Sequence, residues 1–196
     1  MALSGFKNNS NGNKGKSKFE PLSEGVHTGR LVQIIDLGIQ QDEYQGVVSE
    51  RHKVFFTFEI PGETVNVNGE DLPKFISTEL TVSLFKKAKL PSFVKALDPT
   101  AKLDETLNLA DLVGKGAQLN IGRTKTGNAK ILNAMPLAKG MSVEETNTEL
   151  VVFDIDNQDS SVLSKLPNFI QEKIANSLSQ KSAPKGGQKS GLPDIM

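Results

Sequence analysis

Few side chains in this chain of 196 residues could perform catalysis. His27 and His52 are the two histidines, and the chain has no cysteine. A zinc site would therefore depend mostly on carboxylates, and none of them follows a usual ligand spacing. Gly114-Lys115-Gly116 lacks the spacing and the following Ser or Thr of a phosphate-binding loop. We therefore predict that the chain is not an enzyme and that it uses no cofactor and no metal ion.

Cations and aromatic rings are better placed for binding a ligand. A protein that binds single-stranded nucleic acid needs cations along the phosphates and flat side chains on which bases stack. The segment from Arg51 to Ile60 alternates polar and apolar residues, which places Arg51, Lys53 and Phe55 on one face of a strand. Phe55 could be a stacking platform between two cations, or it could pack under a loop or the C-terminal helix. The alternation leaves both interpretations open.

Two more basic groups extend the predicted interface. One follows the third predicted strand, and the other lies at the tip and on the return strand of the last hairpin. In an OB-fold the loops between strands 1 and 2 and between strands 4 and 5 flank the ligand, which adds Tyr44 at one rim. The predicted DNA contacts are Arg51, Lys53, Phe55, Tyr44, Lys86, Lys87, Lys89, Arg123, Lys125 and Lys130. Because aromatic residues are only 6% of the chain, we expect phosphate contacts to dominate and salt to weaken binding.

The elements that must position these residues are mostly strands. Strands are predicted wherever apolar and polar residues alternate between turn signals, and Asn68-Gly69 is a strong hairpin signal. The predicted strands are Val26–Ile39, Arg51–Ile60, Phe75–Leu84, Ala117–Gly122 and Ala129–Leu137. Helical spacing predicts short helices over Phe85–Leu97 and Leu107–Val113. Three strands, a helical connection and two strands are the order of an OB-fold.

The predicted fold class is therefore mainly β with helical additions. We expect a five-stranded OB-type Greek-key barrel over residues 20–140, followed by a C-terminal helix and flexible termini. Residues 1–19 are interpreted as a basic disordered arm, 141–162 as an acidic linker, 163–178 as an amphipathic helix and 179–196 as a flexible tail.

The overall composition indicates the cellular compartment but not the ligand. Lys plus Arg and Asp plus Glu are both 23, so net charge says nothing about the ligand. The absence of cysteine favours a reducing compartment. Neither a signal-peptide stretch nor an apolar run of membrane-spanning length is present. We expect a soluble cytoplasmic protein, in the host cell cytoplasm if the chain is viral, with no membrane partner.

Several short motifs resemble a bacteriophage family of single-stranded DNA-binding, helix-destabilising OB-fold replication proteins. The similarity runs from Gly25 to about Met141, and its carriers include Gly25-Val26-His27-Thr28-Gly29, Lys53-Val54-Phe55-Phe56-Thr57-Phe58 and Leu84-Phe85-Lys86-Lys87-Ala88-Lys89. Leu166 to Ser177 is similar to a C-terminal segment of such proteins. The basic N-terminal arm departs from the pattern. The resemblance implies coating of single-stranded DNA during replication or recombination, and it assigns no individual DNA contact.

The last residues resemble the partner-recruiting tip of single-stranded DNA-binding proteins. Asp194, Ile195 and Met196 are the predicted partner-binding residues, with replication or recombination proteins as partners. The tip has one acidic residue where bacterial tips have several, and an ordinary disordered end is the alternative. The acidic stretch 144–159 could compete with DNA for the basic face.

Two other functions stay open. The first alternative is a phage structural or protein-interaction module that binds another protein through its acidic segment and helix. A divalent-metal nuclease would need a carboxylate cluster that the strands do not show. Oligomeric state is open, and a dimer is compatible with the sequence.

Overall fold

Three long strands begin the described part of the chain, which covers residues 21–178 of the computed structural model. β1 (Gly25–Tyr44), β2 (Val47–Val67) and β3 (Glu70–Thr81) pair as an antiparallel meander. Residues 45–46 and 68–69 adopt positive φ at the two hairpin turns, a geometry that matches the twist of the flanking strands. The turn predicted at Asn68-Gly69 is confirmed.

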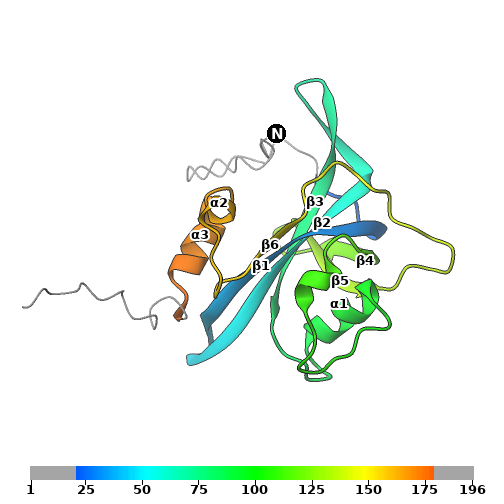
Figure 1. Ribbon diagram of the computed structural model, residues 1–196. Helices are drawn as coiled ribbons and strands as arrows, with labels where there is room; N and C mark the ends of the chain where they lie inside the picture. The colour runs from blue at the N-terminus through cyan, green and yellow to red at the C-terminus, as the bar shows by residue number, and fades with distance from the viewer. Residues whose placement is uncertain (1–20, 179–196) are drawn as a thin grey trace, which may run out of the picture.

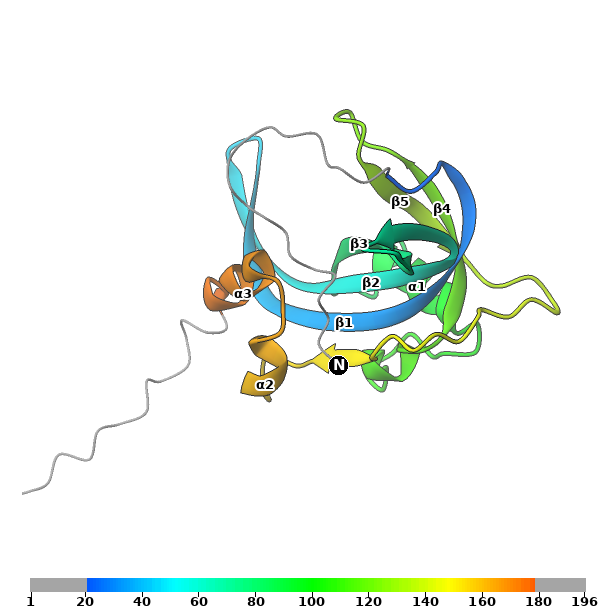
Figure 2. The same ribbon diagram turned by 90° about the horizontal axis from the view of Figure 1, so that it is seen from above.

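A helical connection and two more strands complete the sheet. α1 (Lys89–Leu97) and the short 3₁₀ helix η1 (Leu109–Leu112) precede β4 (Gly116–Arg123) and β5 (Ala129–Met135). The sheet order is β3-β2-β1-β4-β5. The sheet curves strongly (Figure 2), and its outer strands β3 and β5 lie near each other without pairing. The predicted order of three strands, a helical connection and two strands is confirmed.

β1 bends because two glycines and two register shifts interrupt it. The register shifts lie at Leu31/Gln33 and at Asp36/Gly38. Gly38 has φ of 67°, and the Asp36 carboxylate accepts a hydrogen bond from its N–H at 2.7 Å. At Gly29 a Cβ would lie 2.7 Å from the end of the Leu119 side chain, so a larger residue would require the core side chains of Leu119 and Ile60 to shift. The bend lets one strand pair with β2 on one side and with β4 on the other.

The main core lies between the inner face of the curved sheet and α1. Inward residues of β2 and β3 meet one apolar side of the helix, and Phe56, Phe58 and Phe93 form its aromatic centre with ring centroids 6.2–6.5 Å apart. α1 begins at Lys89 rather than at Phe85 as predicted. Pro91 explains the difference: it has no N–H and its ring clashes with a preceding helical turn, so it is tolerated only in the first turn. Residues 82–88 are therefore a connecting segment.

The C-terminal part of the described chain packs on the opposite, outer face of the sheet (Figure 1). β6 (Val151–Phe153) pairs in parallel with Gln33–Ile35 of β1, and α2 (Ser160–Leu163) and α3 (Asn168–Ala175) follow. Residues 141–162, interpreted from the sequence as an acidic linker, thus contain a strand and a helical turn. Within 163–178, the helix occupies only 168–175. No helix among residues 21–178 is long and apolar enough to cross a membrane.

Candidate nucleic-acid interface

The outer face of β1 and β2, where the predicted stacking platform lies, is covered by α3. The ring of Phe55 meets the ring of Phe169 edge-on, with centroids 6.0 Å apart. Phe55 also packs against an apolar cluster whose buried members are Ile35, Leu37, Phe153, Ile155, Leu166, Ile170 and Ile174. Of the two interpretations of Phe55, packing under the C-terminal helix is the one observed. The alternation placed Phe55 correctly on the outer face but could not show what packs against it.

Lys53 is closed off by the same helix and by carboxylates. Its ammonium lies 2.6 Å from Asp42 and 3.0 Å from Glu79, and its side chain is only 13% exposed. Lys173 of α3 also donates to Glu79. Burial opposes the charged forms, but these hydrogen bonds prevail, so the pKa of Lys53 is raised and that of Glu79 is lowered. With two anions already paired to it, Lys53 has little charge left for a phosphate.

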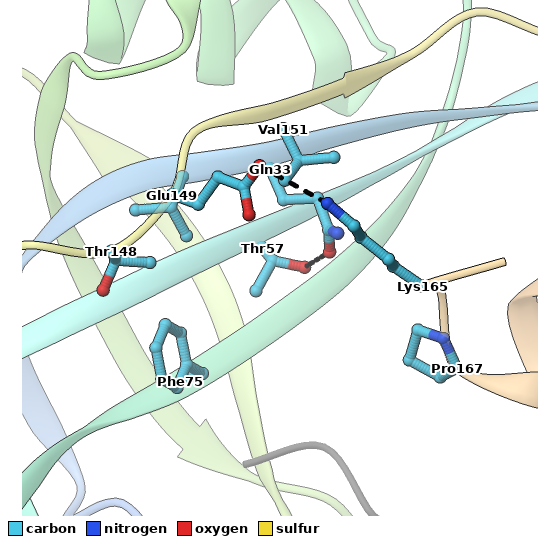
Figure 3. A pocket seen from close by; sticks show the side chains of 9 residues that line it. Gln33, Thr57, Phe75, Thr148, Glu149, Val151, Lys165 and Pro167 are labelled. Carbon is cyan, nitrogen blue, oxygen red and sulfur yellow. Dashed lines mark hydrogen bonds and ion pairs between the residues drawn. The ribbon is translucent and has the colours of Figure 1, made fainter. Parts of the chain in front are cut away.

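The outer face carries at least two depressions. One is a cavity of about 30 Å³ between the sheet and the C-terminal segment (Figure 3), floored by Gln33, Thr57 and Phe75. It has room for about one water molecule, and the ion pair of Lys165 with Glu149 lies at its side. The other measures about 360 Å³ and is lined in part by Glu59 and Glu144. The first is too small for a nucleobase, and the carboxylates of the second would repel phosphate.

Arg51 and Tyr44 lie toward the tip of the β1–β2 hairpin. Arg51 is exposed, and its guanidinium donates to the Ser49 hydroxyl at 3.3 Å. Tyr44 is the last residue of β1 and pairs with Val47 across the turn. Val47 and Val48 are exposed at this tip. The hairpin thus presents one cation beside apolar side chains.

The segment 82–89 carries the second basic group and lies at the same end of the sheet. The N–H of Val82 donates to the carbonyl of His52 at 2.8 Å, which places the start of the segment beside the early residues of β2. Lys86, Lys87 and Lys89 are exposed, and none has an ion pair with a carboxylate of residues 21–178. These lysines are free to meet an anionic ligand.

The β4–β5 hairpin holds the third basic group, which is only partly free. Arg123 forms an ion pair with Glu24 at 3.3 Å. Lys125 at the tip and Lys130 on β5 are exposed and have no ion pair with any other described residue. Asp194, Ile195 and Met196, the predicted partner-binding tip, lie outside the described residues.

A serine, histidine and glutamate group with the composition of catalytic machinery lies near the start of β1. The Ser23 hydroxyl donates to Glu63, and the His27 Nδ1 lies 3.5 Å from the same carboxylate. The His27 Nε2 lies 3.4 Å from the Ser23 hydroxyl oxygen and 3.0 Å from the Ser23 carbonyl oxygen. A ring nitrogen that donates to this carbonyl cannot accept the serine proton, which goes to Glu63 in any case. No group of three or more His, Asp or Glu within residues 21–178 could hold a metal ion.

His52 makes folding stability depend on pH. Its Nε2 lies 2.6 Å from the Asp36 carboxylate at the β1 register shift, and this hydrogen bond above all raises the pKa of His52. A group with a raised pKa in the folded state stabilises the fold fully below its ordinary pKa of 6.5 and loses that contribution as pH rises through the folded value.

We therefore expect the free energy of unfolding to decrease as the pH rises from about 6 to 8. The decrease should be smaller in the variant His52→Gln, which cannot be protonated. Urea unfolding at both pH values measures it. Asp36→Asn should have the same effect because it removes the partner, and an unchanged pH dependence in both variants contradicts this assignment.

The sequence prediction overlooked Phe85, which is 84% exposed next to Lys86 and Lys87. The residue was placed at the start of a predicted helix and was not among the predicted DNA contacts. The position of Pro91 could have indicated the later helix start and therefore an unpacked ring.

Comparisons with protein-family models and with curated proteins find no match to this chain. The function is therefore inferred from the strand arrangement, the covered outer face and the exposed cations.

Proposed function

We propose that this chain is a non-enzymatic OB-type protein that binds single-stranded DNA, coating it in replication or recombination as the resemblance to the phage family implies. Binding occurs by neutralisation of phosphates and stacking of bases, without turnover. The observation that carries the proposal is the group of exposed cations within the predicted interface that have no carboxylate partner among residues 21–178. These are Arg51, Lys86, Lys87, Lys89, Lys125 and Lys130.

The strand arrangement supports an OB-type barrel. The sheet order β3-β2-β1-β4-β5, the closeness of β3 to β5 and a helix between β3 and β4 in the chain are what a five-stranded Greek-key barrel requires. Such barrels bind oligonucleotides on the strand 2–3 face and with the loops 1–2 and 4–5. Here α3 occupies part of that face, which leaves the loops and the sheet ends for DNA. The absence of cysteine supports a cytoplasmic setting.

Fluorescence anisotropy with a labelled oligo-dT of about 30 nucleotides and its duplex counterpart tests the proposal. We expect preferential binding of the single strand, because bases must be free to stack. With about four phosphates neutralised, a rise from about 50 to 200 mM salt should weaken binding on the order of 50-fold. Absence of binding at low salt, or equal affinity for the duplex, contradicts the proposal.

The double variant Lys86→Gln/Lys87→Gln locates the phosphate contacts. It should reduce the slope of log affinity against log salt by about 1.4, because each contact with a single strand contributes about 0.7. Lys102→Gln/Lys139→Gln is the matched control, since both lysines are exposed and lie outside the predicted interface. An equal slope in the two double variants would place the phosphate contacts elsewhere.

A phage structural or protein-interaction module is the second candidate function, and the covered Phe55 face favours it. A module of this kind needs no open nucleic-acid face and could use the exposed Val47 and Val48 at the β1–β2 tip. Failure of the anisotropy experiment for both DNA forms makes this candidate the leading one.

A further inference from the structure

Phe85 stands apart from the other phenylalanines of the described chain. Its side chain is 84% exposed, whereas the rings of Phe56, Phe58 and Phe93 are buried in the main core. Phe55 and Phe169 pack against each other, Phe153 is buried with the C-terminal segment, and Phe75 is half-buried. Burying a phenylalanine stabilises a fold by about 1.5–3 kcal/mol, and Phe85 gains almost none of this. Its ring therefore has no packing role within residues 21–178.

The backbone around Phe85 is anchored on both sides. Val82 is hydrogen-bonded to β2, and the Ala88 N–H donates to the Phe85 carbonyl at 2.8 Å, which closes a turn. Immediately afterwards, Leu90, Phe93 and Val94 of α1 are buried in the main core. The ring is thus presented to solvent from a turn held by a strand and a helix.

The sequence on both sides of Phe85 is rich in lysine and contains no acidic residue. Residues 80–97 contain four lysines and no aspartate or glutamate. Three of these lysines are exposed in the segment 82–89, while Lys95 donates to the carbonyls of Pro99 and Ala101. Val82 and Leu84 add exposed apolar surface in the same segment. A flat ring among free cations matches a nucleotide, which offers a π-face and a phosphate.

Resting on the proposed function, we infer that the segment 82–89 is the primary contact for single-stranded DNA, with one base stacked on Phe85 and neighbouring phosphates on Lys86, Lys87 and Lys89. The stacking residue is therefore Phe85 and not Phe55. An anionic membrane surface is a poorer match: binding to it needs an amphipathic helix with a broad apolar face, and residues 82–88 form no helix.

Phe85→Trp provides a direct test, because the chain has no other tryptophan. Titration with oligo-dT should quench the Trp fluorescence as the base stacks, and anisotropy of the labelled oligonucleotide measures binding in the same samples. Leu150→Trp is the control, because Leu150 is an exposed apolar residue of the C-terminal segment and lies outside the predicted interface. Its fluorescence should stay constant at saturation. Phe85→Ala should weaken binding by about 5- to 100-fold, and Phe85→Trp should retain it.

The outcomes separate this inference from the proposed function. Binding by anisotropy without quenching of the Phe85→Trp fluorescence overturns the inference and leaves the function standing. Absence of binding by the wild-type chain overturns both. A blue shift on vesicles of phosphatidylcholine and phosphatidylserine, without quenching by DNA, would assign the segment to a lipid surface instead.

Discussion

An Ile170→Ala variant should lose about 2–4 kcal/mol of unfolding free energy without gaining affinity for single-stranded DNA. Ile170 is 1% exposed and lies in the apolar cluster that joins α3 to Ile35 and Leu37 of β1. Truncation removes buried methyl groups and leaves a cavity, because a close-packed cluster relaxes only partly. Urea unfolding followed by circular dichroism measures the loss, and anisotropy measures the affinity.

The affinity measurement decides whether α3 is a permanent cover or a displaceable lid. A lid would open more easily in Ile170→Ala, expose Phe55 and increase DNA affinity. The buried carboxylate of Glu59 also accepts hydrogen bonds from Thr146 and Thr148 of the C-terminal segment, which supports a permanent cover. Leu132→Ala is the control for stability, and it should cost less than about 1 kcal/mol because Leu132 is exposed.

Lys53→Met should destabilise the fold by about 2–3 kcal/mol and leave DNA binding unchanged. The substitution keeps an apolar stem but removes the cation that joins Asp42 to Glu79. Removing Lys53 leaves the Asp42 carboxylate without its cation, whereas Glu79 still pairs with Lys173. An ion pair that loses one partner leaves an uncompensated charge, which destabilises the fold. Urea unfolding near neutral pH measures the effect. Lys86→Met, at an exposed lysine, should change stability by less than about 0.5 kcal/mol.

The same variant should change the response to acid. The pKa of Glu79 is lowered in the folded state, so its contribution is present above the ordinary value of 4.5 and is lost as pH falls through the folded value. Lys53→Met removes part of this lowering, so its stability should decrease less on acidification. A double variant with Glu79→Gln should then lose less stability than the two single losses added together. Strict additivity would mean that Lys53 and Glu79 are not coupled.

The order of strands and helices was predictable because local patterns determine it. The alternation in Arg51–Ile60 placed Val54, Phe56 and Phe58 on the core face, and all three are buried. Asn68-Gly69 specified a turn because both residues tolerate positive φ. Boundaries were less accurate: β2 extends from Val47 to Val67, since strand pairing resumes beyond Pro61-Gly62 after an irregularity between Ile60 and Thr64.

The site was predictable only as a set of residue types. Periodicity placed Lys53 and Phe55 together on the outer face, which is where they lie. The helix that covers them, α3, is more than 100 residues away in sequence, and its amphipathic pattern did not show which part of the sheet it packs against. The preceding segment 141–162 was interpreted as a solvated linker because of its acidic composition. Phe153 and Ile155, two apolar residues among carboxylates, were the available signal that this segment packs.

By itself, the sequence determined the order of strands along the chain, the core face of the central part of β2 and the absence of cysteine chemistry, since these follow from residue type and spacing along one segment. Only the tertiary structure decided which cations are free and which rings are exposed. Lys53 and Lys86 were both predicted as DNA contacts. Long-range packing pairs Lys53 with Glu79 and leaves Lys86 exposed to solvent. Likewise Phe55 meets Phe169, whereas Pro91 keeps Phe85 outside α1 and open to a ligand.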